Sequence, residues 1–323
     1  MKTKNPKVGV IILNWNGKEI LEKCLDSLKK TDYDNMHVLV VDNASTDGSV
    51  DMVKKNYPWV EVLELDKNYG FAKGNNEGVR YFMRKYGDMK YVVLLNNDIE
   101  IIDKKWLKKI VNFAEKNKNI GIVGCKLLYP DGKIQHAGGY MQKSIVLGLH
   151  YLSHPLNREY WFPEYVCAAC MLIKSEIIKK IGLFDEIYSP AYYEDADFCY
   201  RVKRLGYRVA CYLNTEIIHY EGYSSKKRKN EINVLRNRNK YIFAILNIGV
   251  ISLLPILFTS IGYAFKTMFC IENYGKIKYL KFREKGYNKI VECYLVWKEL
   301  LKIRKKIIIS KIKRRSFQQN KSQ

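Results

Sequence analysis

Short apolar segments alternate with longer amphipathic segments between residue 7 and about residue 125. The strand-like segments are Val8–Leu13, His37–Val41, Val60–Leu65, Tyr91–Leu95 and Ile120–Gly124. Between them lie Lys18–Lys30, Ser49–Asn56, Phe71–Tyr86 and Lys104–Lys116, in which apolar residues recur with the period of a helix. Nearly continuous apolar strands joined by helices predict an α/β domain whose mainly parallel central sheet is covered on both faces.

Polar loops follow three of these strands at their carboxyl ends. They contain Asn14 and Asn16 after the first strand, Asp42 after the second, and Asn96, Asn97 and Asp98 after the fourth. Any one of them could be an ordinary turn or helix N-cap. Because ligands bind beyond the carboxyl ends of parallel strands, three loops at one edge predict a binding site. Asp98, with Asn96 two residues before it, suits a divalent cation held against a diphosphate.

A second group of acidic residues interrupts an aromatic segment about one hundred residues later, in the run Tyr192-Tyr193-Glu194-Asp195-Ala196-Asp197. We predict a helix over Asp195–Leu205, which places Glu194 and Asp195 at a helix N-terminus. Upstream, residues 126–162 are rich in turns and aromatics and predict a hairpin with a loop that covers a ligand. Val166–Ile173 predicts a strand and Ser175–Ile181 a helix. The acidic residue at the end of the fourth strand suits the binding of a cation, and the later acidic run suits a general base.

The positive charge of the chain is concentrated at one end. The formal net charge is +23, yet residues 1–225 hold 32 Lys and Arg against 28 Asp and Glu, whereas residues 226–323 hold 24 against 5. We therefore predict three parts. They are an α/β domain over 1–225, a basic linker with an apolar helical segment over 226–270, and a basic amphipathic tail over 271–323.

An uncharged segment, residues 241–265, lies between two basic segments. As a helix it would be long enough to cross a bilayer. Gly249 and Pro255 interrupt it, however, and a single span would place one basic flank on the wrong side of the membrane. We therefore favour a re-entrant or interfacial helical pair over a full span.

The tail beyond this segment has the pattern of a membrane-surface helix. Ile290, Tyr294, Trp297 and Leu301 lie along one helical face, with lysines and arginines elsewhere. This suits an anionic membrane, and it explains the charge and the uncharged segment together. Nucleic-acid binding is the competing interpretation, because residues 226–229 are similar to a nuclear-localisation string. A solvated charge run without a partner is the third.

Eight cysteines are scattered through a chain that is too large to need disulfides, which fits a reducing cytosolic environment. Cys167 and Cys170 form a CxxC pattern, but no second pair or His cluster lies at zinc spacing, so we predict that they pack in the core. The apolar run after the N-terminal lysines is too short for a signal peptide and lacks a small-residue cleavage site. It is better explained as the first strand.

Seven segments, in order along residues 7–225, resemble the motifs of the inverting glycosyltransferases of family 2, which have the GT-A fold. They are Val10–Gly17, Val40–Ser49, Asn68–Asn76, Leu94–Asp98, Gly182–Glu186, Tyr193–Arg201 and His219–Gly222. Seven ordered matches are far more specific than any one of them. Within the family, the chain most resembles rhamnosyltransferase-like enzymes of surface polysaccharide assembly.

The resemblance implies a nucleotide-sugar pocket and a metal site. The nucleotide-sugar residues would be Asn14, Asn16, Asp42, Asn68, Gly70, Asn76, Asn96 and Asn97. Asp98 and His219 would bind Mg²⁺ or Mn²⁺. Many members have Asp where this chain has Asn96, so the metal prediction depends mainly on Asp98.

The resemblance also implies that the acidic run is catalytic. Asp195 would be the general base that takes the proton of an acceptor hydroxyl. Glu194 and Asp197 would orient the acceptor or the base, with Arg201 as their charge partner.

The sequence thus predicts a glycosyltransferase associated with the cytoplasmic face of the cell membrane. It would move a sugar from an NDP- or dTDP-sugar to a hydroxyl of a glycan or lipid-linked acceptor in surface polysaccharide synthesis. The alternative is a basic nucleic-acid- or membrane-binding protein with a nucleotide-fold domain as scaffold. A dehydrogenase is not expected, because no GxGxxG follows the first strand.

Overall fold

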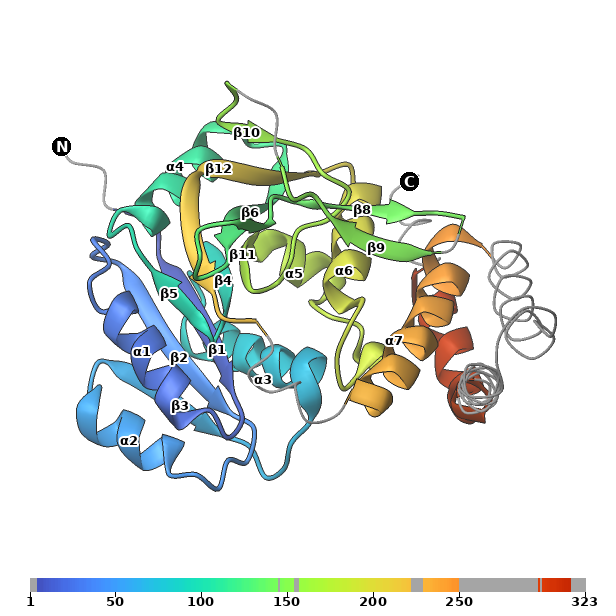
Figure 1. The fold of residues 1–323 in the computed structure, drawn as a ribbon, viewed down its shortest axis with the longest axis horizontal. Coiled ribbons are helices and arrows are strands. Elements are labelled where there is room, and N and C mark those ends of the chain that lie inside the picture. The colour runs from blue at the N-terminus through green and yellow to red at the C-terminus, as the bar shows by residue number, and fades with distance from the viewer. Residues whose placement is uncertain are drawn as a thin grey trace, which may run out of the picture. The chain divides into compact units, whose positions relative to one another are not determined.

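The computed structural model describes residues 5–144, 146–153, 157–221, 229–249, 296 and 298–314. Figure 1 shows the order of the elements along the chain. The chain divides into two compact units, one made of Met1–Tyr140 and Leu149–Lys226, the other of Met141–Gly148 and Lys227–Gln323.

The first unit is built on a ten-stranded sheet in the order β10-β12-β6-β11-β4-β1-β2-β3, with β5 paired to β12 and β7 paired to β6. Its strands are β1 (Val8–Asn14), β2 (Met36–Asp42), β3 (Val60–Glu64), β4 (Tyr91–Asn96), β5 (Ile99–Ile101), β6 (Ile120–Leu128), β7 (Ile134–His136), β10 (Tyr160–Trp161), β11 (Cys170–Lys174) and β12 (Arg208–His219).

Most of the sheet is parallel, as the sequence predicts. β1 pairs in parallel with β2 and β4, and β2 pairs in parallel with β3. β11 is antiparallel to both β4 and β6, so β6, and β12 parallel to it, share the direction of β1. The carboxyl ends of β1, β2 and β4 therefore lie at one edge of the sheet.

Helices cover both faces of this sheet (Figure 1). One face packs against α1 (Lys18–Leu28), α2 (Ser49–Asn56) and α4 (Trp106–Lys116), which join the strands in one buried apolar cluster. The other face packs against α3 (Gly70–Lys85), α5 (Ser175–Ile181) and α6 (Glu194–Arg204). All six form within a few residues of their predicted bounds.

Close contact between α3 and the sheet requires glycine. A Cβ atom at Gly74 would lie 2.5 Å from the Leu13 side chain, and one at Gly78 would lie 2.7 Å from the Val41 side chain. The absence of side chains at these positions brings the first turns of α3 against the last residues of β1 and β2. The loop before α3 is thereby held beside the polar edge of the sheet.

The predicted hairpin is present in the segment between β6 and β11. β8 (Gly139–Gln142) and β9 (Leu147–His150) form a separate two-stranded sheet. The strand predicted over Val166–Ile173 begins later, at Cys170. One reason is that the Cys167 backbone N–H donates to His136 Nε2, at 3.1 Å, instead of to a neighbouring strand.

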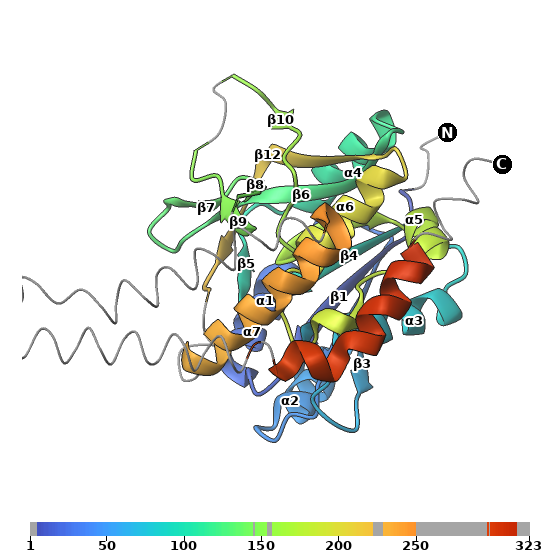
Figure 2. The same cartoon turned by 90° about the vertical axis from the view of Figure 1, so that its right-hand side faces the viewer.

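The described part of the second unit is helical. It contains α7 (Lys229–Phe243), one π-helical turn (Ala244–Ile248) and a helix over residues 298–314, and Figure 2 shows α7 and this last helix in orange and red. Within the part of the chain that the structure describes, no helix combines the length and the apolar character needed to cross a bilayer. Most of the uncharged segment, from residue 250 onward, lies outside the described residues, as do residues 226–228 and three of the four apolar tail positions.

Candidate active site

The polar loops converge as the sequence predicts. In the sheet register Asn14 lies opposite Asp42, and Leu13 lies opposite Asn96. The Asn97 Nδ2 atom donates to Asn14 Oδ1 at 2.8 Å, and Asn14 Nδ2 donates to Asp42 Oδ1 at 3.3 Å. Asn14 is completely buried. Through these two hydrogen bonds its amide joins the ends of β1, β2 and β4.

Ser45 extends this network to the next loop. Its backbone N–H donates to Asp42 Oδ2 at 2.8 Å, and its Oγ accepts from the Asn16 backbone N–H at 2.9 Å. The Thr46 N–H in turn donates to Asn16 Oδ1 at 2.7 Å. Both carboxylate oxygens of Asp42 are thus hydrogen-bonded, which fixes the two loops to each other.

Asn68 and Gly70 belong to a third loop at this edge, the one that leads into α3. Gly70 N–H donates to Asn68 Oδ1 at 2.8 Å, and Asn43 bonds to the same loop by accepting from Tyr69 N–H at 2.9 Å. Gly70 has a φ of +79°, and a Cβ there would lie 2.5 Å from Pro190 Cα. Any side chain at position 70 would therefore separate this loop from the segment that leads to α6.

Asn76 is accounted for by contacts within the protein. Its Nδ2 donates to the Phe184 carbonyl and to Glu186 Oε1, both at 3.0 Å, and its Oδ1 accepts from Phe184 N–H at 3.1 Å. The side chain is buried. These bonds use both N–H groups of the amide and one lone pair of its oxygen, so Asn76 fixes the segment before α6. A contact of Asn76 with the nucleotide stays a prediction.

Asp98 and His219 meet although 121 residues separate them in the sequence. β12 pairs with β5, which places His219 opposite Ile99, the residue after Asp98. The His219 Nε2 atom lies 3.1 Å from Asp98 Oδ1 and 3.2 Å from Asn96 Nδ2. Both Asp98 and His219 are buried. The two predicted metal ligands and Asn96 are therefore one cluster.

Gln135 on β7 fixes the orientation of this histidine. His219 Nδ1 lies 2.6 Å from Gln135 Oε1, and Gln135 Nε2 donates to the His219 carbonyl at 3.3 Å. An amide oxygen only accepts, so Nδ1 carries the proton. In the neutral ring, Nε2 then presents a lone pair toward Asp98.

This arrangement fits a divalent cation. Asp98 Oδ1 is buried and receives no hydrogen bond from any described residue, although it lies beside Nε2. A carboxylate oxygen and a neutral imidazole nitrogen attract each other only through a proton or a shared cation. The described residues contain no cluster of three or more His, Cys, Asp and Glu at metal spacing. Two protein ligands suit a cation that takes its remaining ligands from a diphosphate and water.

The acidic run begins α6 as predicted, after an unusual turn. Tyr192 and Tyr193 both have left-handed backbone conformations, with φ of +80° and +72°. Glu194 is buried, and its Oε2 has no hydrogen-bond partner among the described residues. Burial, and then the charge of Asp195, raise the pKa of Glu194 well above its usual value. Glu194 is therefore harder to ionise than an exposed carboxyl group.

Asp195 differs from its neighbour because it is partly exposed. Burial raises its pKa, while the Ala196 backbone N–H, which donates to Oδ1 at 2.7 Å, and the charge of His150 lower it. A carboxylate with a raised pKa at a helix N-terminus has the properties of a general base.

Asp197 is completely buried and holds α6 in place. Arg201 Nε donates to its Oδ2 at 2.9 Å, and Tyr188 Oη donates to its Oδ1 at 3.0 Å. Arg201 also donates to the carbonyls of Ile181 and Leu183. The predicted ion pair of Asp197 and Arg201 is confirmed. These contacts account for the burial of Asp197 without any contact to an acceptor sugar.

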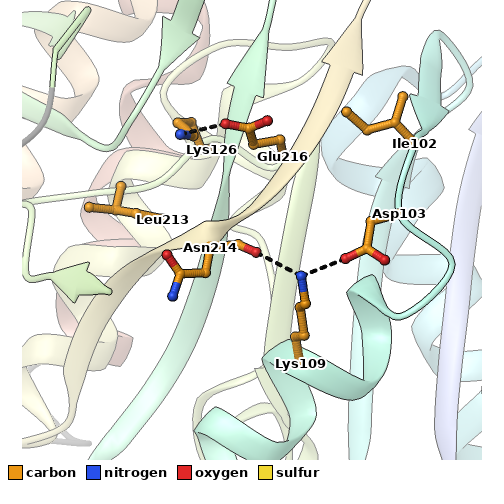
Figure 3. A pocket seen from close by; sticks show the side chains of 7 residues that line it. All are labelled: Ile102, Asp103, Lys109, Lys126, Leu213, Asn214 and Glu216. Carbon is orange, nitrogen blue, oxygen red and sulfur yellow. Dashed lines mark hydrogen bonds and ion pairs between the residues drawn. The ribbon is translucent and has the colours of Figure 1, made fainter. Parts of the chain in front are cut away.

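A cavity of about 400 Å³ lies elsewhere, where β12 bulges away from β6 (Figure 3). Its charged groups pair with each other: Lys109 with Asp103 at 2.7 Å, and Lys126 with Glu216 at 2.6 Å. None of the predicted site residues lines it. We therefore place the site at the strand ends, where the polar groups converge.

Sequence reasoning missed three residues of this site: Asn43, Ser45 and Gln135. Asn43 and Ser45 lie in the loop after β2, and the turn-forming composition of that loop was the available signal. Gln135 precedes His136 in a turn-rich segment, and nothing local connects it to His219. Its role depends on the pairing of β6 with both β7 and β12.

Comparison with known proteins identifies the class. Residues 9–182 match the family model described as Glycosyl transferase family 2. This chain therefore belongs to glycosyltransferase family 2, a family of transferases. Family membership favours the enzyme over the alternative of a basic binding protein.

Two curated relatives are glycan-synthesis proteins. The chain is 29% identical over 231 residues to the O-antigen biosynthesis protein RfbC of Myxococcus xanthus, a match that covers 68% of this chain and only 18% of that protein. It is 23% identical over 259 residues to N-acetylglucosaminyl-diphospho-decaprenol L-rhamnosyltransferase of Mycobacterium tuberculosis, covering 72% of this chain and 82% of the relative.

The fold also matches a solved structure, that of a mannosyltransferase from Pyrobaculum calidifontis in complex with GDP-Man and Mn²⁺. The TM-score is 0.59 at 16% identity, with 92% of this chain and 88% of the other covered. This likeness confirms the GT-A fold of the first unit.

Proposed function

We propose that this chain transfers a sugar from a nucleotide-diphospho-sugar to a hydroxyl of a glycan or lipid-linked acceptor, in the synthesis of a cell-surface polysaccharide. One observation carries the proposal. The edge that gathers Asn14, Asp42 and Asn97 also brings Asp98 and His219 together, although no local sequence pattern requires it. A diphosphate with its cation is the ligand for which that combination is suited.

The nucleotide would bind along the loops that Asn14 organises. Asn16, Asp42, Asn68 and Gly70 shape this pocket, and their hydrogen bonds to backbone groups hold it open before the donor arrives. Such preorganisation lowers the entropic cost of binding.

Mg²⁺ or Mn²⁺ is the cofactor in this proposal. Asp98 and His219 would hold the cation, and rotation of the Asn96 amide would present its oxygen to the same point. Bound there, the cation would offset the charge that develops on the departing diphosphate. Two solved neighbours, the mannosyltransferase and GalNAc-T7, are complexes with Mn²⁺, which is consistent with this cofactor.

Asp195 would remove the proton from the acceptor hydroxyl. The O–H bond breaks as the oxygen attacks the anomeric carbon on the face opposite the nucleoside diphosphate. The bond to the diphosphate breaks, the configuration inverts, and the proton resides on the Asp195 carboxylate. Glu194, kept protonated by burial, would donate a hydrogen bond without competing for that proton.

The helix over residues 298–314 supports association with a membrane. Leu301, Ile308, Ile309 and Ile312 are 57–64% exposed, among many lysines and arginines. Exposed aliphatic side chains surrounded by cations suit the anionic surface of the cytoplasmic leaflet. Replacing Ile308 and Ile312 with Ser should reduce co-sedimentation with vesicles containing phosphatidylglycerol and leave thermal stability unchanged. Equal co-sedimentation of this variant would contradict the proposal.

A screen of sugar nucleotides tests the function itself. UDP-, GDP- and dTDP-sugars are added with and without Mn²⁺, and the thermal midpoint is measured. A ligand that binds only the native state raises that midpoint. We expect one donor class to raise it in a Mn²⁺-dependent way and to be consumed when octyl glycosides are supplied as acceptors. A chain that responds to no sugar nucleotide would contradict the proposal.

A further inference from the structure

Two histidines lie near the candidate base, and neither the sequence motifs nor the donor site accounts for them. The Ala168 backbone N–H bonds to Asp195, and the N–H of the preceding residue, Cys167, donates to His136 Nε2. The ring centroids of His136 and His150 are 4.4 Å apart, with the rings nearly perpendicular at 83°. His136 is buried at 1% exposure, whereas His150 is exposed. His150 also lies 6.2 Å from the ring of Tyr165 and acts electrostatically on Asp195.

The backbone fixes this pair. Ala137 N–H donates to the Tyr151 carbonyl at 3.0 Å, and Tyr151 N–H donates to the Gly138 carbonyl at 2.9 Å. Tyr165 Oη donates to the Leu149 carbonyl at 3.2 Å. These bonds hold the end of β9 beside the end of β7.

His136 contributes an unsatisfied group. Its Nε2 accepts from Cys167 N–H, so in the neutral ring the proton is on Nδ1. Nδ1 is buried and has no hydrogen-bond partner among the described residues. Burial lowers the pKa of His136 well below its usual value, which keeps the ring neutral. A neutral His136 ring can pack against the His150 ring without charge repulsion between the two.

β7 thereby carries one residue on the donor side of the candidate active site and one on the acceptor side. Gln135 extends to His219 in the candidate metal centre, and His136 extends to His150 beside Asp195. A group bound at His150 would lie near the base.

We propose that His150 binds the acceptor by hydrogen-bonding a sugar hydroxyl next to the attacking one, and that His136 positions the His150 ring for this contact. This inference rests on the proposed function. An exposed imidazole offers both a donor and an acceptor, which matches a polyol.

The surroundings favour a neutral sugar ring over a phosphate at this position. Besides His150, the titratable groups that interact with Asp195 include Glu194 and Cys199 of α6, and Tyr165 and Cys167 of the segment before β11. The strongest electrostatic partners of Asp195 and Tyr165 among the described residues include no Lys or Arg. A phosphate here would be repelled by the Asp195 carboxylate.

The test compares transfer to an octyl glycoside with hydrolysis of the donor by water, using the donor that the screen identifies and the glycoside that the wild type uses best. We expect His150→Ala to raise the KM for the glycoside about tenfold, as for a lost hydrogen bond. The KM for the donor and the rate of hydrolysis should stay within about twofold. His150→Gln, which keeps a donor and an acceptor, should be intermediate.

His136→Gln separates positioning from folding. The Gln Oε1 atom can still accept from Cys167 N–H, but the ring against His150 is lost. We expect a native thermal midpoint and a raised glycoside KM. His37→Ala removes a histidine whose ring packs on Tyr86, at 4.4 Å, and should change neither KM.

The pH profile gives a readout that a merely structural role would not move. The charge of His150 lowers the pKa of Asp195, so His150→Ala should shift the acidic limb of kcat/KM to higher pH. A folded His150→Ala protein with an unchanged glycoside KM and an unchanged acidic limb would overturn the inference. Absence of transfer by the wild type to any glycoside, or full activity of Asp195→Asn, would instead count against the proposed function.

Discussion

The two sides of the candidate active site differ in how completely their polar groups are satisfied. At the strand ends, Asn14, Asp42 and Asn97 form a closed network, in which both carboxylate oxygens of Asp42 accept hydrogen bonds. On the other side, Glu194 Oε2 and His136 Nδ1 are buried without partners among the described residues. Unsatisfied buried groups cost stability. The comparison teaches that the network at the strand ends is satisfied without ligand, whereas the acceptor side gives up stability for chemistry.

Asp98 lies where the two sides meet, and its loss should have the largest effect. Asp98→Asn removes the charge that a cation requires, so we expect transfer to fall by roughly 10³-fold or more and the Mn²⁺-dependent rise of the thermal midpoint with donor to disappear. Asp51→Asn, an exposed carboxylate in α2, is the matched control. Retention of the Mn²⁺-dependent rise in Asp98→Asn would place the cation elsewhere.

Gln135 should affect metal binding and transfer only through the orientation of His219. Gln135→Leu removes the acceptor that fixes the proton on Nδ1, so the lone pair of Nε2 is no longer held toward Asp98. Loss of such an outer partner costs about 10- to 100-fold in metal affinity or activity. The measurement is transfer rate against Mn²⁺ concentration, with exposed Gln142→Leu as control. An unchanged Mn²⁺ dependence would argue that His219 has no metal role.

Asn14→Ala should disrupt the hydrogen-bond network at the strand ends. It leaves Asp42 Oδ1 without one donor and Asn97 Nδ2 without its acceptor, and each unsatisfied buried group costs about 1–3 kcal/mol. We expect the free energy of unfolding in urea to fall by at least that amount. Exposed Asn56→Ala should stay within about 0.5 kcal/mol of wild type. Equal stability of the two variants would show that the network does not stabilise the fold.

Glu194→Gln should have the opposite sign, because it replaces a buried acid that ionises as the pH rises with a side chain that cannot ionise. The pKa of Glu194 is raised in the folded state, so its contribution to stability is fully present below the pKa of the unfolded chain and is lost as pH rises. The variant should therefore gain thermal stability relative to wild type as the pH rises from 4 to 8. A difference that does not change with pH would mean that Glu194 is not a buried acid.

The sequence predicts the features that depend on local order. Residues 8–14 and 91–96 end in polar groups whatever the rest of the chain does, so the strand ends and their convergence follow from pattern and topology. The pairing of β12 with β5 does not follow in this way, because it joins residues about 120 positions apart. His219 was therefore assigned to the metal by family resemblance, and Gln135 and His150 were not anticipated.

Protein contacts also account for two residues that the resemblance associates with ligands. Asn76 and Asp197 are polar residues within motifs, but both are buried and fully bonded to the segment around α6. A motif contains residues that hold the site together as well as those that contact substrate. Only the three-dimensional partners distinguish the two kinds.

Asp195→Asn tests the central claim most directly, because it changes the acceptor side and leaves the donor side intact. Donor affinity is measured by titration in the presence of Mn²⁺, and transfer to the octyl glycoside is measured in parallel. We expect wild-type donor affinity and a loss of transfer of roughly 10²- to 10⁴-fold, the contribution of a general base. Transfer at the wild-type rate by this variant would contradict the assignment of Asp195 as the base.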